Sequence, residues 1–255
     1  MKIKEIHVRQ MTLWSLFKVA LEQSWRVFRL SIPGNVLILL VITGIFYQTS
    51  TYVESFGVSE KVFNGVLIYY NIFFVSFTSA NIFYLLTISS DKPYMAQVKE
   101  ALVKTLKIFP TLLFTVVLYC LLFSLGLLFF LIPGMLLYVF LGLFTPVIVF
   151  EKKGIFTSLI RSAGLVSRGF GKMFISFLII SVITYLGALF IGAFIEGFLY
   201  ALPNLGSMLS NLSYVVFMPL IGCFYAQLYF DLRLKGEFFD FEILEQEVTE
   251  AKTAG

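Results

Sequence analysis

The sequence predicts an all-α, polytopic membrane protein with six transmembrane helices, three amphipathic helices at the cytoplasmic surface and a threefold internal repeat. Three observations support this fold class. Of the 255 residues, 59% are apolar and 13% are charged, against roughly 45–50% and about 25% in soluble domains. The apolar residues gather in long runs, and the basic residues lie between them on alternate connections. This composition excludes an ordinary soluble enzyme, a disordered chain and a disulfide scaffold.

Each predicted span is an apolar run that can cross the hydrocarbon core as a helix. About 20 residues cover roughly 30 Å, and a helix satisfies its own backbone polar groups. We expect spans at about 30–47, 62–88, 110–131, 134–150, 173–195 and 214–232. Only Ile132 and Pro133 separate the third and fourth spans, and Pro133-Gly134 is a turn signal, so these spans form a tight hairpin. Pro146 and Pro219 predict kinks in spans four and six.

The distribution of basic residues predicts the orientation. With six crossings, 18 of the 19 Lys and Arg residues fall on one side, and the positive-inside rule makes that side, with both termini, cytoplasmic. The polar start, 1–10, and the late first span argue against a cleaved signal peptide. We expect residues 1–235 to form a single integral membrane domain and residues 236–255 an acidic, largely disordered cytoplasmic tail; a docking role for this tail stays open.

Three cytoplasmic segments show apolar residues at helical spacing opposite basic ones. They precede spans one, three and five. Such helices lie in the headgroup layer, where their cations attract anionic lipids. The alternative is that they are connectors whose long side chains snorkel to water. The candidate lipid contacts are Lys18, Arg26, Arg29, Lys104, Lys107, Arg161, Arg168 and Lys172.

The same three segments align with one another. In each, a small residue stands eight positions before a Phe, and a pair of spans follows. We infer a threefold repeat of an interfacial helix and a two-span hairpin. The aligned pairs are Ala20 and Phe28, Ala101 and Phe109, and Ser162 and Phe170.

A few polar residues fall within the predicted membrane region. Asn64, Asn71 and Thr78 recur at seven-residue spacing in span two, and their burial in lipid without partners would be costly. Hydrogen bonding to neighbouring helices is the first interpretation, and lining of a pore or substrate path is the second. Glu196, near the outer end of span five, is a candidate coupling or proton-relay residue, although it can also reach interfacial water.

The sequence carries no motif for catalysis, for a cofactor or for a metal. The single histidine, His7, has no second ligand, and there is no nucleophile elbow or nucleotide-binding loop. Cys120 and Cys223 lie in apolar runs and are expected to be small apolar fillers. We therefore predict that the protein is not an enzyme and has no catalytic, cofactor or metal-ligating residues.

Short motifs carry a resemblance to a known family. They are Pro133-Gly134, Phe144-Thr145-Pro146, Phe150-Glu151, then Gly154, Ser162, Leu165 and Gly169, and the segment from Tyr229 to Arg233. In these motifs the chain resembles the YciC-like bacterial inner-membrane proteins, and also the membrane domain of some glycerophosphodiester phosphodiesterases. Members of the family have no established biochemical activity. The resemblance covers most of the chain and implies a location and a topology but no reaction.

These observations predict a non-enzymatic protein of the bacterial inner membrane that acts in envelope or lipid homeostasis through its basic interfacial helices. The expected partners are anionic lipids and a membrane protein, and not nucleic acid. The alternative is a small transporter or lipid-translocating protein that uses the polar stripe of span two and Glu196. A cavity lined by Asn71, Thr78 and Glu196 would favour that alternative, whereas a closed bundle would count against it.

Overall fold

The computed structural model describes residues 12–55, 60–89, 91–198 and 213–237, with side chains for 12–42, 69–89, 91–195, 197–198 and 215–235. All regular structure within these ranges is helical. The helices are α1 (Leu13–Ser55), α2 (Glu60–Thr87), α3 (Tyr94–Lys107), α4 (Phe109–Phe129), α5 (Leu131–Leu141), α6 (Phe144–Glu151), α7 (Ile155–Ser167), α8 (Phe170–Phe198) and α10 (Ser213–Glu237).

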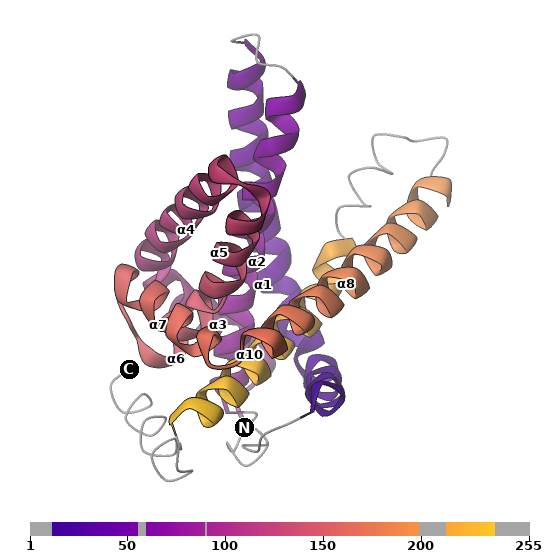
Figure 1. Cartoon of the computed structure of the whole chain (residues 1–255). Coiled ribbons are helices and arrows are strands. Elements are labelled where there is room, and N and C mark those ends of the chain that lie inside the picture. Colours follow the sequence, from indigo (N-terminus) through magenta and orange to yellow (C-terminus); the bar gives the residue numbers. More distant parts are fainter. Residues whose placement is uncertain (1–11, 56–59, 90, 199–212, 238–255) are drawn as a thin grey trace.

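Helices from both ends of the chain form the centre of the molecule. α1, α2 and α10 pack against one another, and α4 packs on α2. α8 contacts α10 but rises away from the α4–α5 hairpin, as Figure 1 shows. The short helices α3, α6 and α7 lie together at the lower end of this view.

Five segments of the described chain are long and apolar enough to cross a membrane. They are Leu13–Ile42, Phe109–Phe129, Leu131–Glu151, Phe170–Ile195 and Val215–Lys235. They match predicted spans one, three, four, five and six. Predicted span two is present as the helix α2, but its described residues are less apolar because they include several Asn, Ser and Thr residues. An all-helical protein with several potential spans is therefore confirmed, and the sixth crossing stays a prediction.

Two of the three predicted interfacial helices are separate elements, and the third is not. α3 and α7 occupy the segments before spans three and five. Before span one, however, the chain does not stop, because α1 runs through 43 residues with Pro33 inside it. Figure 1 shows the indigo N-terminal part of α1 running in a different direction from the rest. The interfacial segment and span one are thus one helix.

The turn between spans three and four lies before the predicted Pro133-Gly134. α4 ends at Phe129, and Phe130 takes an extended conformation with φ −170° and ψ 158°. Pro133 then falls in the first turn of α5, where its missing N–H is no loss. Gly134 instead allows α4 and α5 to pack closely: a Cβ placed on Gly126 of α4 would lie 2.8 Å from the Cα of Gly134 in α5.

Span four is interrupted where the sequence predicts only a kink. α5 ends at Leu141 and α6 begins at Phe144, just before Pro146. The side chain of Ser162, in α7, bridges this break: its hydroxyl accepts a hydrogen bond from Leu143 N at 3.0 Å and donates one to Phe140 O at 2.9 Å. A break in a membrane helix needs such partners, since lipid offers none to the freed backbone groups.

Candidate functional site

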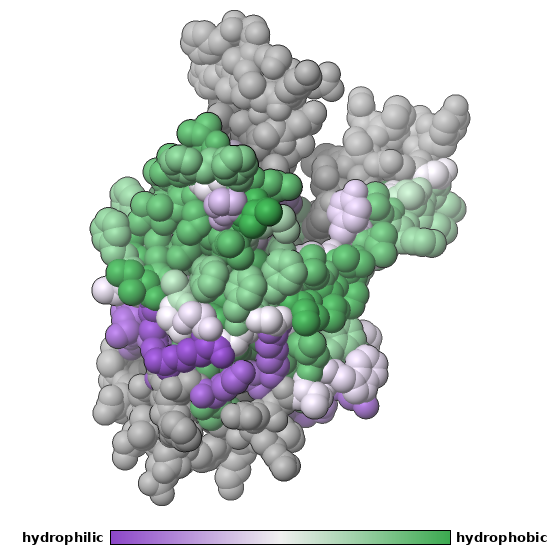
Figure 2. All heavy atoms as spheres, in the orientation of Figure 1, coloured by the Kyte–Doolittle hydropathy of each residue, from purple (hydrophilic) through white to green (hydrophobic). Residues whose placement is uncertain are grey.

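The basic residues predicted to contact lipid lie along one edge of the hydrophobic surface. Figure 2 shows hydrophobic residues covering the upper body and hydrophilic residues gathered below them, at the level of α6 and α7 in Figure 1. Lys18, Arg26 and Arg29 are exposed on α1. Lys107 ends α3, Arg168 follows α7, and both are exposed. We call these five residues, with Lys104, the basic rim.

Part of the positive charge of α3 is offset by Glu100. The Glu100 carboxylate forms ion pairs with Lys92 and with Lys104, the second at 3.0 Å. The hydrogen bond from Lys92, assisted by Lys104, holds the pKa of Glu100 below its usual range. The carboxylate is therefore charged at neutral pH, and two cations of α3, Lys99 and Lys107, are not part of these ion pairs with Glu100.

Helices α3 and α7 bury one face, which includes small and polar residues, and also expose large apolar residues on the other. On α3, Ala101 and Thr105 are buried while Met95 is 73% exposed. On α7, Ser158 is buried while Ile160 is 73% exposed. Such a surface is unfavourable in water and favourable in the interfacial layer of a membrane, where aromatic and aliphatic groups of amphipathic helices insert.

A cluster of charged side chains lies inside this edge, where α6, α7, α8 and α10 approach one another. Its members come from sequence positions up to 82 apart and include two carboxylates and three cations. We call it the Glu151 cluster: Glu151, Arg161, Lys172, Tyr229, Asp231 and Arg233.

Glu151 is the centre of these contacts. Arg161 Nε lies 3.0 Å from each of its carboxylate oxygens, and the Tyr229 hydroxyl donates to Oε1 at 2.8 Å. Arg233 Nε lies 3.9 Å from the same oxygen. The side chains of Glu151 and Arg233 are only 7% and 8% exposed, so these charges are held away from bulk water.

Two of the predicted lipid contacts form ion pairs with carboxylates of other helices. Arg161 pairs with Glu151, and Lys172 pairs with Asp231. These ion pairs link α7 to α6 and α8 to α10. Asp231 of α10 pairs with Lys172 of α8, and Arg233 of α10 lies 3.9 Å from Glu151 of α6.

Several motifs that carry the family resemblance meet at this cluster. The ring of Phe150 packs on those of Tyr229 and Phe230 at 5.5 and 4.9 Å between centroids. A Cβ on Gly169 would lie 2.4 Å from a side-chain atom of Leu232. The motifs thus form the packed junction between the middle of the chain and its last helix.

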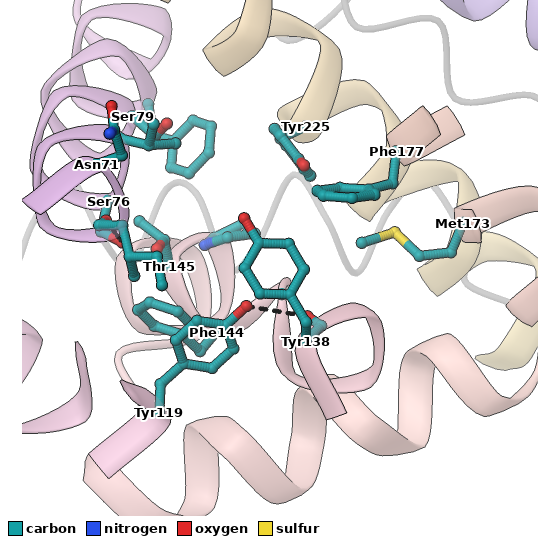
Figure 3. Close-up of a pocket in the computed structure, with 15 residues that line it drawn as sticks. Asn71, Ser76, Ser79, Tyr119, Tyr138, Phe144, Thr145, Met173, Phe177 and Tyr225 are labelled. Atoms are coloured by element: carbon teal, nitrogen blue, oxygen red, sulfur yellow. Dashed lines mark hydrogen bonds between the residues drawn. The ribbon is translucent and has the colours of Figure 1, made fainter. Parts of the chain in front are cut away.

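A cavity of about 270 Å³ lies above this junction, between α2, α4, α5, α6, α8 and α10. Figure 3 shows Asn71, Ser76 and Ser79 on one side of it and Met173 and Phe177 on the other. The interrupted span four contributes its base. Its lining consists of Asn71, Ile72, Val75, Ser76, Ser79, Phe83, Tyr119, Tyr138, Gly142, Phe144, Thr145, Pro146, Met173, Phe177 and Tyr225.

The polar residues predicted within the membrane do not converge on one place. Asn71 lines the cavity and is exposed at the surface. Thr78 does not line it; its hydroxyl donates to Phe74 O of its own helix at 2.6 Å and to Met218 Sδ of α10 at 3.2 Å. The side chains of Asn64 and Glu196 lie outside the described residues. Among the described residues of α2, the polar side chains that line the cavity are those of Asn71, Ser76 and Ser79.

Neither a metal centre nor a thiol pair emerges from the parts of the chain with described side chains. No group of His, Cys, Asp and Glu residues is placed there to hold a metal ion. Cys120 and Cys223 are buried free thiols.

Fold and site together define a class, an all-helical protein with several helices suited to cross a membrane, a charged edge and a cavity between its helices. No family model, curated protein or solved structure matches the chain.

The cavity and the Glu151 cluster were not predicted from the sequence. The spacing of Asn71, Val75, Ser79 and Phe83 marks one helical face, and this was the available signal for the cavity wall on α2. The partners of Glu151 are distant in sequence and carry no such signal.

Proposed function

We propose that the protein is a non-enzymatic integral protein of a bacterial inner membrane that acts in envelope or lipid homeostasis. Its ligands on the cytoplasmic side are anionic lipid head groups, which bind the basic rim. The observation that carries this proposal is the outward orientation of large apolar residues on α3 and α7 beside exposed cations. Membership of the YciC-like family, with six crossings and cytoplasmic termini, belongs to the same proposal.

The surface of α1 supports the same function. Trp14 and Trp25 are exposed, and Lys18 Nζ lies 5.3 Å from the centre of the Trp14 ring. Tryptophan with neighbouring lysine and arginine is typical of helices that lie at the level of the head groups.

The proposed threefold repeat also has structural support. The small residues aligned by the repeat, Ala20, Ala101 and Ser162, are all 0% exposed. A side chain larger than these would not fit against the neighbouring helices without displacement. Each basic segment thus packs against the neighbouring helices at its aligned small residue, Ala20, Ala101 or Ser162.

Neutralising the outward cations should weaken binding of anionic lipid. We expect K104Q/K107Q/R168Q to co-purify at least about fivefold less phosphatidylglycerol, because each cation near an anionic surface contributes roughly 1 kcal/mol. The measurement is mass spectrometry of lipids bound to protein purified from the same membranes. Arg161 is not substituted in this variant, because its replacement would remove the cation closest to the Glu151 carboxylate.

The matched control is R9Q/K61Q/K252Q, which removes three positive charges without altering α1, α3 or α7. It should retain its phosphatidylglycerol. Equal lipid content in the rim variant and the unmodified protein would contradict the proposed role of the rim.

Reporter fusions test the proposed topology independently. Fusions at Lys99 and Gly154 should be active only as cytoplasmic reporters, and fusions at Gly57 and Asn204 only as periplasmic ones, because the basic segments remain inside. A single reporter active on the opposite side would require a different number of crossings.

A further inference from the structure

We propose that the cavity binds the uncharged, hydroxyl-bearing head of a lipid alcohol, of which diacylglycerol is the type. This is a second site, separate from the basic rim, and it takes a different class of lipid. It does not depend on the proposed function of the rim. The argument rests on one unpartnered hydroxyl, on the absence of charge from the lining, and on the size and position of the cavity.

The unpartnered hydroxyl belongs to Ser79. This residue is 4% exposed, its Oγ has no hydrogen-bond partner among the residues that the structure describes, and it lines the cavity. Its neighbour Ser76 donates to Ile72 O of the same helix at 2.7 Å. A buried hydroxyl without a partner is costly, and a ligand hydroxyl or ester oxygen in the cavity would satisfy it.

The lining residues contain no Asp, Glu, Lys, Arg or His. The charged groups at the junction below the cavity, those of the Glu151 cluster, already pair with one another. A phosphate placed in this cavity would lose its hydration without gaining a cation, which is strongly unfavourable. An uncharged head with hydroxyl and ester groups fits a lining of serine, threonine, tyrosine and asparagine side chains.

The cavity is too small for a whole lipid. Its volume of about 270 Å³ lies just below the range of roughly 300–1,000 Å³ typical of pockets that enclose drug-sized ligands. A lipid head can enter while its acyl chains stay in the bilayer. Asn71 is exposed at one end, and Ser79 is buried eight residues further along α2, a distance of about 12 Å. The head would therefore reach inward from Asn71 to Ser79.

Photolabelling in nanodiscs tests this site. The full-length protein is placed in phosphatidylcholine nanodiscs with a photoactivatable diacylglycerol, and labelling is measured as the probe concentration rises. We expect saturable labelling that unlabelled dioleoylglycerol displaces and dioleoylphosphatidylglycerol does not. Labelled peptides should come from the lining segments of α2, α6 or α8.

Two substitutions of Ser79 and one control make the test specific. S79A should weaken binding about 3- to 10-fold, the effect of one lost hydrogen bond, and S79L should abolish saturable labelling by filling the space. The control is S176A, because Ser176 is also buried without a partner but does not line the cavity. It should bind as the unmodified protein does.

Three results would overturn the proposal: no saturable labelling, unchanged binding in S79A, or equal displacement by dioleoylphosphatidylglycerol. S79A removes only an unsatisfied hydroxyl and should fold, so it decides the matter even where S79L does not fold. The K104Q/K107Q/R168Q variant should bind the diacylglycerol probe normally. Failure at the rim and failure at the cavity are therefore distinguishable.

Discussion

The E151Q variant should be less stable than the unmodified protein by about 3–5 kcal/mol, the usual cost of removing one partner of a buried ion pair. Glutamine keeps the shape of the side chain but loses the charge that faces Arg161 and Arg233. Its single amide oxygen also cannot replace the two carboxylate oxygens, both of which accept from Arg161 Nε and one of which accepts from the Tyr229 hydroxyl. The measurement is thermal unfolding of the purified protein in detergent, followed by circular dichroism.

The matched control for this variant is E100Q. Glu100 also pairs with two cations, Lys92 and Lys104, but on an exposed helix surface. Exposed pairs contribute about 0–1 kcal/mol, so E100Q should unfold close to the temperature of the unmodified protein. Similar losses for the two variants would show that burial of the Glu151 cluster has no special weight.

The S162A variant should lose about 2–4 kcal/mol of stability, because each buried backbone group left without a partner costs roughly 1–3 kcal/mol. Ser162 bonds both Leu143 N and Phe140 O at the break in span four. Alanine fits the space and removes both bonds. Thermal unfolding again gives the measurement, and labelling of a cysteine placed at Gly142 should become faster as the break loosens.

S158A provides the comparison within the same helix. Ser158 and Ser162 are both 0% exposed on α7, but the Ser158 hydroxyl bonds only Ile155 O of its own helix. We expect its replacement to cost about 1 kcal/mol or less. If S158A and S162A were equally destabilised, the break would be held by packing and not by the serine.

Much of the helical architecture could be predicted because its causes are local. The apolar runs mark spans two, three, five and six within about five residues of the bounds of α2, α4, α8 and α10, whereas α1 extends well beyond span one at both ends. The break at Gly142 could not be found in this way. The stretch from Leu131 to Phe150 is almost uniformly apolar, and the hydroxyl that stabilises its interruption lies on another helix.

The basic rim could be predicted from the sequence, whereas the Glu151 cluster could not. The basic rim follows from spacing along single helices, so its residues could be named from the sequence. Arg161 and Lys172 looked identical to rim residues there, because their partners Glu151 and Asp231 are 10 and 59 positions away. For Thr78 the sequence leaves two roles open, hydrogen bonding to a neighbouring helix and lining of a polar path; its hydroxyl donates to Met218 Sδ of α10, and it does not line the cavity. Its seven-residue spacing from Asn71 is close to a helical repeat, but the cavity faces Ser79.

The serine bridge across span four has a consequence for biosynthesis. The chain emerges from the ribosome in order, so the second hairpin reaches the membrane before α7 exists. Until then Leu143 N and Phe140 O, which Ser162 later bonds, have no partner from that helix. The α4–α5 hairpin can therefore form before the backbone at its break is fully hydrogen-bonded. The interval between these two events is the time needed to translate some twenty further residues after Gly142.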